Sequence, residues 1–198
     1  MTEAAQVKVF QALDNNSIEP EFIENIAKDI NKIVDEESYL SQVKEFMLTS
    51  GQEVRKYPSF PDLETCKLRI RLILEEFEEF VNAVEQNNLT ETLDGLVDLQ
   101  YVLSGAVQAL GFGGIFDEAF EEVQASNMSK FVTSEEDVNA SIQKYKELGI
   151  EVKAVYGEQY TVIVRSKDNK VLKGIHFKEP KLDKLIIRAI EENELRDS

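Results

Sequence analysis

Apolar residues in the middle of the chain recur every three to four positions, which is the spacing of an amphipathic α-helix. This pattern predicts one long helix over about 63–86 and a second from Thr90, as its N-cap, to about Leu110. Further helices are predicted over about 38–51 and 115–130. Because the connections between the long helices are short, we expect antiparallel neighbours in a helical bundle.

The pattern changes after about residue 131. A helix capped by Ser134 is followed by two stretches rich in β-branched residues that alternate with polar ones, and this alternation predicts a β-hairpin. The predicted elements of this part are, in order, a helix over 134–148, strands over 152–156 and 159–165, a further strand over 171–177, and a helix over 182–195.

These elements predict a mainly α protein with three parts. Residues 1–37 are expected to form an N-terminal helical extension, with an amphipathic helix over 17–33. Residues 38–131 are expected to form the antiparallel helical bundle. Residues 132–198 are expected to form a small C-terminal α+β segment, made of a helix and a β-hairpin, and the final helix.

The chain is strongly acidic. It carries 38 acidic and 22 basic residues, for a formal net charge of −16. This charge argues against a protein that binds nucleic acid by neutralising phosphates, and against docking on an anionic membrane. No apolar run reaches the roughly 18 residues that a membrane span needs. The first residues lack the basic start and apolar stretch of a signal peptide, so we expect a cytoplasmic protein.

Four glutamates lie close together on the first long helix, in the sequence LEEFEEF: Glu75, Glu76, Glu78 and Glu79. A run of charge is usually a solvated helix face, and Glu75 and Glu78 fit that interpretation. Glu76 and Glu79 border the apolar arc instead, and at a spacing of three they are neighbours on one face. Like charges at this spacing repel unless something positive lies between them.

Asp98 is the only charged residue between Gly95 and Leu110, in a helix that is apolar almost all round and therefore expected to be buried. An unpaired carboxylate in such a place costs several kcal/mol. It must be paired with a basic side chain, bound to a metal ion, or protonated. Asp94 and Glu91 lie one and two turns before it and extend this second acidic cluster.

Antiparallel packing of the two long helices can bring both acidic clusters to one point. About four oxygen ligands without histidine or cysteine suit a hard cation, Mg²⁺ or, as a substitute, Mn²⁺. The predicted ligands are Glu76, Glu79, Asp98 and either Asp94 or Glu91. A metal-bound water, deprotonated with help from Glu75 or Glu76, is expected to attack a phosphorus atom of the substrate.

Amide and basic side chains are candidates for substrate binding. Asn127 continues the apolar stripe of the helix over 115–130, and Lys130 follows about one turn later, so both could reach phosphate oxygens or a base. The alternative is a helix C-terminus whose lysine only complements the helix dipole. Arg69 and Arg71 are further candidates for phosphate binding, and each is alternatively a surface ion-pair partner.

These residues resemble the all-α nucleoside triphosphate pyrophosphohydrolases, a superfamily that includes MazG, the dimeric dUTPases and the phosphoribosyl-ATP pyrophosphohydrolases. The superfamily pattern is EExxE followed by ExxD on the next helix, and EEFEE (75–79) matches its first half. DGLVDLQYV (94–102), FEEVQASNMSK (120–130) and DNKVLKG (168–174) look most similar to the MazG-like, phosphoribosyl-ATP-pyrophosphohydrolase-like branch.

The resemblance covers about residues 40–131 and returns near 168–182. It implies that the bundle over 38–131 is the catalytic core and that a four-helix unit assembles as a homodimer or homotetramer. It also implies that Glu76, Glu79 and Asp98 are metal ligands and that Glu75 is a supporting acid.

Position 95 departs from the pattern, because glycine stands where ExxD expects glutamate. Asp94 lies one residue earlier, on the face of Asp98, and is our preferred fourth ligand. Glu91-x-x-Asp94 also matches ExxD, so Glu91 remains the alternative.

The expected function is that of a Mg²⁺-dependent nucleoside triphosphate pyrophosphohydrolase, which converts a (d)NTP and water to a (d)NMP and pyrophosphate. One alternative is a phosphoribosyl-ATP pyrophosphohydrolase. Another is a non-catalytic helical interaction module that binds nucleotide or metal. We expect a small-molecule substrate, and neither a nucleic acid nor a membrane as partner.

Overall fold

The computed structural model describes residues 38–195. The predicted extension over 1–37, with its helix over 17–33, lies outside the described residues. Among the helices of the described part, none is long and apolar enough to cross a membrane. The chain divides into two compact units, one ending at Gly113 and the other beginning at Gly114.

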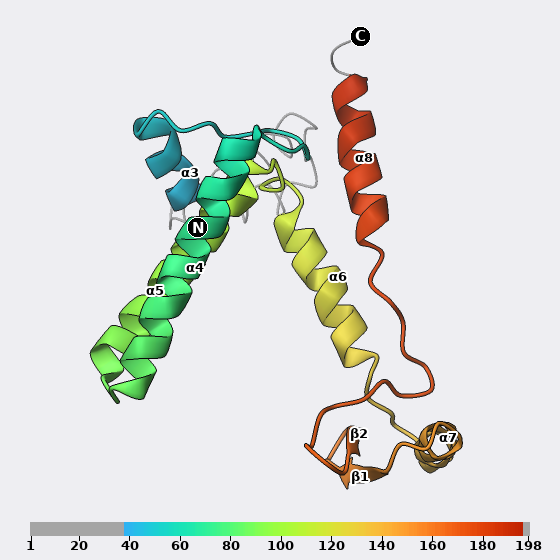
Figure 1. Ribbon diagram of the computed structural model, residues 1–198. Helices are drawn as coiled ribbons and strands as arrows, with labels where there is room; N and C mark the ends of the chain where they lie inside the picture. Colours follow the sequence, from blue (N-terminus) through green and yellow to red (C-terminus); the bar gives the residue numbers. More distant parts are fainter. Residues whose placement is uncertain (1–37, 196–198) are drawn as a thin grey trace, which may run out of the picture. The chain divides into compact units, whose positions relative to one another are not determined.

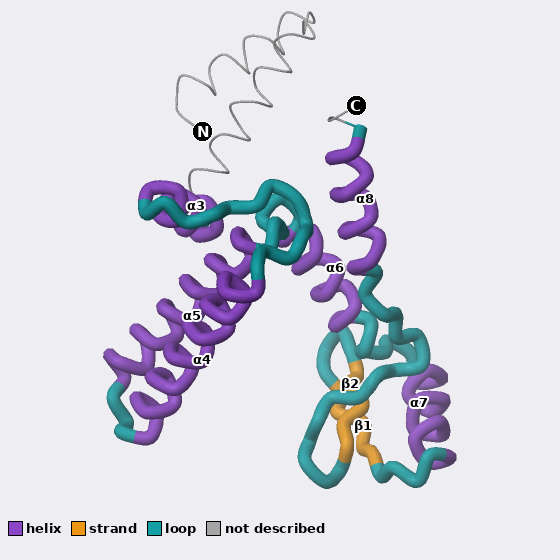
Figure 2. Tube along the Cα trace, turned by 45° about the horizontal axis from the view of Figure 1, so that its top comes forward, coloured by secondary structure: helices purple, strands orange, loops and turns teal. Residues whose placement is uncertain are grey.

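Three helices make up the described part of the first unit: α3 (Tyr39–Thr49), α4 (Leu63–Glu85) and α5 (Leu89–Ala109). α4 and α5 run side by side as an antiparallel pair, and α3 packs against α5 (Figures 1 and 2). The apolar period of the sequence predicted these three helices, and the structure confirms them.

Polar side chains fix where the two long helices begin. Asp62 and Asn88 each accept a hydrogen bond from the backbone N–H three residues further on, at 2.8 Å and 3.3 Å. The prediction of Thr90 as the N-cap of α5 is wrong, because Asn88 takes that position. Asn87 adopts a left-handed conformation, with φ at 52°, and so turns the chain into α5 earlier than expected.

Gly111 ends α5 and allows the connecting loop to come close. Its φ is 76°, and a Cβ at this position would lie 1.9 Å from the carbonyl oxygen of Tyr57. Only glycine fits both the left-handed backbone and this contact. The loop between α3 and α4 is therefore held against the end of α5.

The buried core of the first unit joins α3 to α5. Val43 and Met47 of α3 pack against Ala109 of α5. The side chain of Gln108 is buried beside them, and its amide donates a hydrogen bond to the carbonyl oxygen of Leu40 at 3.0 Å. A satisfied polar contact of this kind fixes how α3 sits on α5.

The second unit contains α6 (Phe116–Met128), α7 (Glu135–Glu147), β1 (Val152–Tyr156), β2 (Thr161–Arg165) and α8 (Leu182–Glu194). The two strands form an antiparallel hairpin, and α7 packs against it (Figure 2). Their core consists of Val132, Val138, Tyr145 and Ile163. The mainly α fold with a small helix-plus-hairpin segment is therefore confirmed.

The start of α7 also agrees with the sequence. The Ser134 side chain accepts a hydrogen bond from the Asp137 N–H at 3.1 Å, as predicted for its N-cap.

The predicted strand over 171–177 is wrong. Val171 forms an isolated bridge to Val164, and the chain then leaves the sheet. Further on, the Ile175 N–H donates to the Ser141 hydroxyl at 3.0 Å. This backbone donor bonds to a side chain of α7 instead of a neighbouring strand, so the ladder does not continue.

α6 lies in the second unit and contacts α8 there, whereas it was predicted with the bundle over 38–131. Arg188 of α8 forms an ion pair with Glu118 of α6. The Ser126 hydroxyl donates to the carbonyl oxygen of Lys178 at 2.8 Å.

Candidate active site

Acidic side chains from α4 and α5 come together on the helical hairpin of the first unit. Glu76 and Asp98 are half-buried, and Glu79 and Asp94 are exposed. The pKa of Glu76 is raised above its ordinary value, first by burial and then by the negative charges of Asp98, Glu79, Glu75 and Asp94, in that order. The acidic residues predicted from the sequence thus share one electrostatic environment, which we call the acidic site.

A close contact between the two helices explains this arrangement. Gly95 is buried, and a Cβ at that position would lie 3.0 Å from the Cα of Phe80 and 3.1 Å from its Cβ. The missing side chain lets α5 approach the backbone of α4. The carboxylates of both clusters lie within about one turn of this contact and are held opposite one another.

The same contact gives a physical reason for the departure from ExxD at position 95. A glutamate at this position would run into the α4 backbone at Phe80. Asp94 is among the charges that raise the pKa of Glu76, and Glu91 is not. This difference favours Asp94 over Glu91 as the fourth member of the acidic site.

The described residues provide no basic partner for the two half-buried acids. The ion pairs of residues 38–195 include neither Glu76 nor Asp98. Within the same residues, no group of three acidic, histidine or cysteine side chains is already close enough to hold a metal ion. The negative charge of the acidic site is therefore not balanced by a basic side chain of the described residues. Its carboxylates are also too far from one another to share a metal ion without moving.

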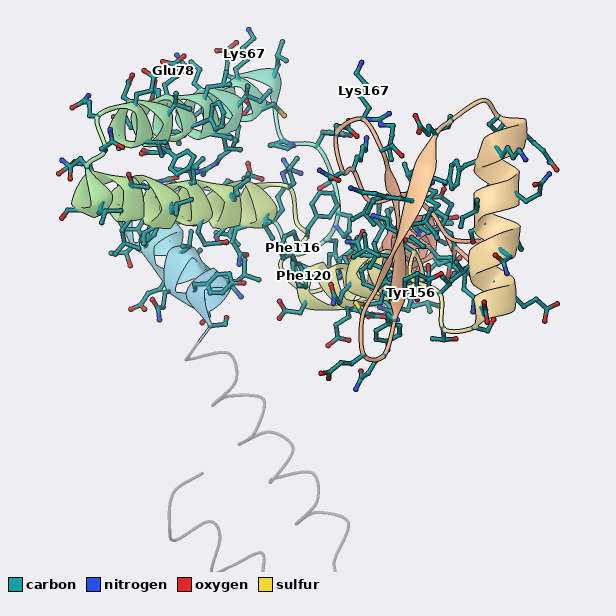
Figure 3. All side chains as sticks on the ribbon, turned by 90° about the horizontal axis from the view of Figure 1, so that it is seen from below. Lys67, Glu78, Phe116, Phe120, Tyr156 and Lys167 are labelled. Atoms are coloured by element: carbon teal, nitrogen blue, oxygen red, sulfur yellow. The ribbon has the colours of Figure 1, made fainter. Side chains whose placement is uncertain are left out.

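Glu78 lies outside the acidic site. Figure 3 shows Glu78 and Lys67 on the side of α4 that is turned away from α5. Glu78 is exposed, and it is absent from the charges that affect Glu76. This position agrees with its interpretation as part of a solvated helix face.

Arg69 is buried, with a relative exposure of 8%, and this position excludes the interpretation as a surface ion-pair partner. Its Nη2 donates to Oε1 of Gln52 at 2.7 Å, while its Nε is buried without a hydrogen-bond partner. Burial lowers the pKa of the Arg69 guanidinium. Arg71, by contrast, is exposed, and its part in substrate binding stays a prediction.

The Arg69 side chain borders a pocket of about 300 Å³. The apolar and aromatic part of its wall consists of Val43, Phe46, Met47, Leu72, Tyr101 and Val102. Gly105 makes room for the guanidinium, since a Cβ there would lie 3.1 Å from Nη1 of Arg69. We call this cavity the Arg69 pocket.

The sequence did not reveal the Arg69 pocket. Gln52 lies just after α3 and carries no periodic signal. Phe46 and Tyr101 are ordinary candidates for a core. The one available signal was Arg69 itself, which shares a helix face with Leu72 and Glu76, three and seven positions further on.

Asn127 and Lys130 lie at the end of α6, in the second unit. The Lys130 ammonium donates a hydrogen bond to the side-chain oxygen of Asn127 at 2.6 Å. The two predicted substrate contacts are thus neighbours, and their role stays a prediction.

Comparison with known proteins supports the assignment of this region. Residues 43–127 match the family model described as phosphoribosyl-ATP pyrophosphohydrolase. The chain is also 40% identical, over 68 residues, to the uncharacterized protein L479 of Acanthamoeba polyphaga mimivirus. That alignment covers 34% of this chain and 27% of the viral protein, so the chain spans about a quarter of its relative's length.

The matched residues contain both acidic clusters, the close contact at Gly95 and the Arg69 pocket. The family match supports pyrophosphohydrolase chemistry in general for this part of the chain. The match over residues 43–127 agrees with the resemblance to the all-α nucleoside triphosphate pyrophosphohydrolase superfamily, to which the phosphoribosyl-ATP pyrophosphohydrolase family belongs.

Proposed function

We propose that this protein is a Mg²⁺-dependent nucleoside triphosphate pyrophosphohydrolase, which cleaves a (d)NTP between its α and β phosphates. The observation that carries the proposal is that acids from α4 and α5 come together beside the close contact of Gly95 with Phe80, without a basic partner for Glu76 or Asp98 among the described residues. The raised pKa of Glu76 agrees with this arrangement. Unpaired carboxylates in one place repel one another, and a divalent cation relieves that repulsion. The family match supports hydrolysis of a pyrophosphate linkage.

The donors of the acidic site fit a hard cation, because all of them are carboxylate oxygens. In our proposal Glu76, Glu79, Asp94 and Asp98 hold Mg²⁺, with Mn²⁺ as a substitute. When bound, the ion neutralises charge on the substrate phosphates and favours deprotonation of water. Binding of the ion would require these carboxylate side chains to come closer together than they are among the described residues.

The protein's own acids handle the proton. The oxygen of a water molecule bonds to the α phosphorus, and the bond from that phosphorus to the bridging oxygen breaks, so that pyrophosphate leaves. A carboxylate oxygen of Glu76 or Glu75 accepts the proton from the water.

Basic and amide side chains bind the substrate in this proposal. In the first unit these are Arg69 and Arg71 of α4. Asn127 and Lys130, at the end of α6 in the second unit, stay candidate phosphate contacts. We further propose a homodimer or homotetramer. Large apolar side chains of α5 are exposed in the single chain, among them Leu93 at 64% and Val97 at 55%, and a second copy would cover them.

The test is a panel of NTPs and dNTPs with Mg²⁺, scored for pyrophosphate and for orthophosphate. We expect pyrophosphate and the monophosphate as products. Orthophosphate as the primary product would contradict the proposed bond cleavage. The absence of turnover for every nucleotide would favour a non-catalytic binding module.

Phosphoribosyl-ATP is the second candidate substrate, because the matching family model carries that activity in its description. It belongs in the same panel. A kcat/KM for phosphoribosyl-ATP that exceeds those of all NTPs and dNTPs would replace the proposed substrate and keep the acidic site.

A further inference from the structure

The Arg69 pocket and the acidic site are neighbours along the same pair of helices. Leu72, in the pocket wall, lies one turn of α4 before Glu76. Val102, on the opposite wall, lies one turn of α5 after Asp98. One turn advances a helix by about 5.4 Å. A substrate whose phosphates reach the acidic site therefore has the pocket within reach of its other end.

The guanidinium of Arg69 has more donors than the described residues satisfy. It carries five N–H donors and no acceptor. Gln52 and, more weakly, the Met47 sulfur accept from Nη2, and Nε is buried without a partner. Among the described residues no carboxylate forms an ion pair with Arg69. Buried unpaired donors are costly, so a ligand that brings acceptors into the pocket gains hydrogen bonds that the empty protein lacks.

The pocket wall suits a flat neutral ring better than a phosphate. Apart from Arg69 and Gln52, it offers mainly aliphatic, aromatic and thioether surface. The rings of Phe46 and Tyr101 meet edge to face, with 5.7 Å between their centroids. A triphosphate carries several charges and needs many donors or a metal ion, whereas a nucleobase needs stacking surface and a few directed polar contacts.

We propose that the Arg69 pocket holds the nucleobase and that Arg69 selects bases that present carbonyl oxygens. Guanine and hypoxanthine have a carbonyl oxygen, O6, beside an acceptor nitrogen, N7. Two N–H groups of one guanidinium can donate to these two acceptors at the same time. Adenine places an amino donor at the same position, and two donors cannot bond to each other. This inference rests on the proposed function, because it takes the base to belong to the nucleotide whose phosphates reach the acidic site.

The sharpest test compares ITP with ATP, which differ where hypoxanthine has a 6-carbonyl and adenine a 6-amino group. For the unmodified protein we expect kcat/KM to favour ITP by about 10-fold to 100-fold, the usual range for one good base contact. In Arg69→Met this ratio should fall close to one. Lys67→Met is the matched control, since Lys67 is exposed on the far side of α4, and it should keep the full ratio.

Gly105→Ala provides a variant that keeps Arg69 and its partner Gln52. The added methyl group lies 3.1 Å from Nη1 and displaces the guanidinium, without removing its charge. We expect the ITP preference to fall several-fold. A preference that is unchanged in both Arg69→Met and Gly105→Ala would overturn the inference. An equal rise in KM for ITP and ATP in Arg69→Met would also overturn it, because that result identifies Arg69 as a phosphate contact.

Binding of the nucleosides inosine and adenosine separates this inference from the proposed function. Neither ligand carries a phosphate, so calorimetry measures binding of the base in the pocket even if the protein turns over no nucleotide. Stronger binding of inosine that Arg69→Met abolishes supports the pocket, whether or not pyrophosphate is released from any nucleotide. Pyrophosphate release with equal binding of both nucleosides, and no ITP preference, leaves the proposed function standing and refutes the base selection.

Discussion

Gly95 of α5 lies directly against the backbone of Phe80 of α4, so that a Cβ at position 95 would be 3.0 Å from the Phe80 Cα. A glycine in the middle of a helix costs about 1 kcal/mol relative to alanine. Here it allows two helices to approach closely enough for their carboxylates to influence one another. Because Gly95 has no side chain, α4 and α5 come close enough to hold the carboxylates of the acidic site opposite one another.

Gly95→Ala should destabilise the protein, although alanine is the better helix former. Forcing an extra methyl group into a packed contact typically costs about 1–3 kcal/mol, which outweighs a helix gain of about 1 kcal/mol. We therefore expect a net loss of about 1 kcal/mol in the free energy of unfolding, measured by urea denaturation. Gly114→Ala is the control, because a Cβ there meets nothing within 4 Å, and it should change stability by less than about 0.5 kcal/mol. Equal effects of both variants would contradict the steric role of Gly95.

Glu76→Gln should abolish activity and, in the absence of metal, raise the thermal midpoint at neutral pH. The like charges around Glu76 disfavour its ionised form, and glutamine removes that repulsion without changing the size of the side chain. Thermal unfolding in EDTA measures the effect. Glu78→Gln, on the solvated face, should leave both the midpoint and the activity unchanged. A lower midpoint for Glu76→Gln would show that the charge of Glu76 stabilises the fold.

The stability difference between the unmodified protein and Glu76→Gln should depend on pH with a definite sign. Because the folded pKa of Glu76 lies above the ordinary value of 4.5, the folded protein holds the proton more tightly than the unfolded chain. Below about the ordinary pKa, ionisation of Glu76 therefore costs the folded protein no stability. The loss of stability develops as the pH rises from the ordinary pKa through the folded pKa, and it is complete above the folded pKa. Thermal midpoints of both proteins without metal, recorded from acidic to neutral pH, should coincide at the acid end and separate as the pH rises. Curves that separate in the opposite direction would contradict the raised pKa.

Mg²⁺ should stabilise the protein, and loss of a proposed ligand should remove this effect. Binding to the folded state alone raises stability by about 2.7 kcal/mol at a concentration 100 times the dissociation constant. We expect the thermal midpoint of the unmodified protein to rise with Mg²⁺ and to return when EDTA is added. In Asp98→Asn the midpoint should hardly respond to Mg²⁺. A full response in that variant would move the metal site elsewhere.

Glu79→Gln and Asp98→Asn should each reduce kcat/KM by about 100-fold or more, as expected for an essential metal ligand. Pyrophosphate release from the best nucleotide of the panel, at saturating Mg²⁺, is the measurement. Retained activity in both variants would exclude the acidic site as the catalytic centre. Partial rescue by Mn²⁺ would agree with weakened ligation.

The helices and the acids that face one another in the acidic site could be predicted from the sequence because their signals are local. The apolar period of α4 and α5 fixes their faces, and Glu76, Glu79 and Asp98 stand out as acids on or beside those faces. The EExxE pattern pointed to the superfamily of the matching family model for the same reason. Short-range hydrogen bonds likewise made Ser134 recognisable as a cap.

Local signals were less reliable where two capping residues or two kinds of partner compete. Thr90 looked like the start of α5, but the left-handed turn at Asn87 favours Asn88. The stretch over 171–177 has strand-forming residues, but after Leu172 its backbone N–H groups bond to partners outside the sheet. The competing partner in the second case comes from α7, more than thirty positions earlier in the chain.

The sequence by itself determined the helical spans, the acidic residues and their order along the chain, because these depend on neighbours within a turn or two. Only the tertiary structure decided that Gly95 lets α5 contact the backbone of α4, that Arg69 is buried beside a pocket, and that α6 packs with α8. Each of these features depends on how close two distant segments come, and that distance is set by packing across the whole unit.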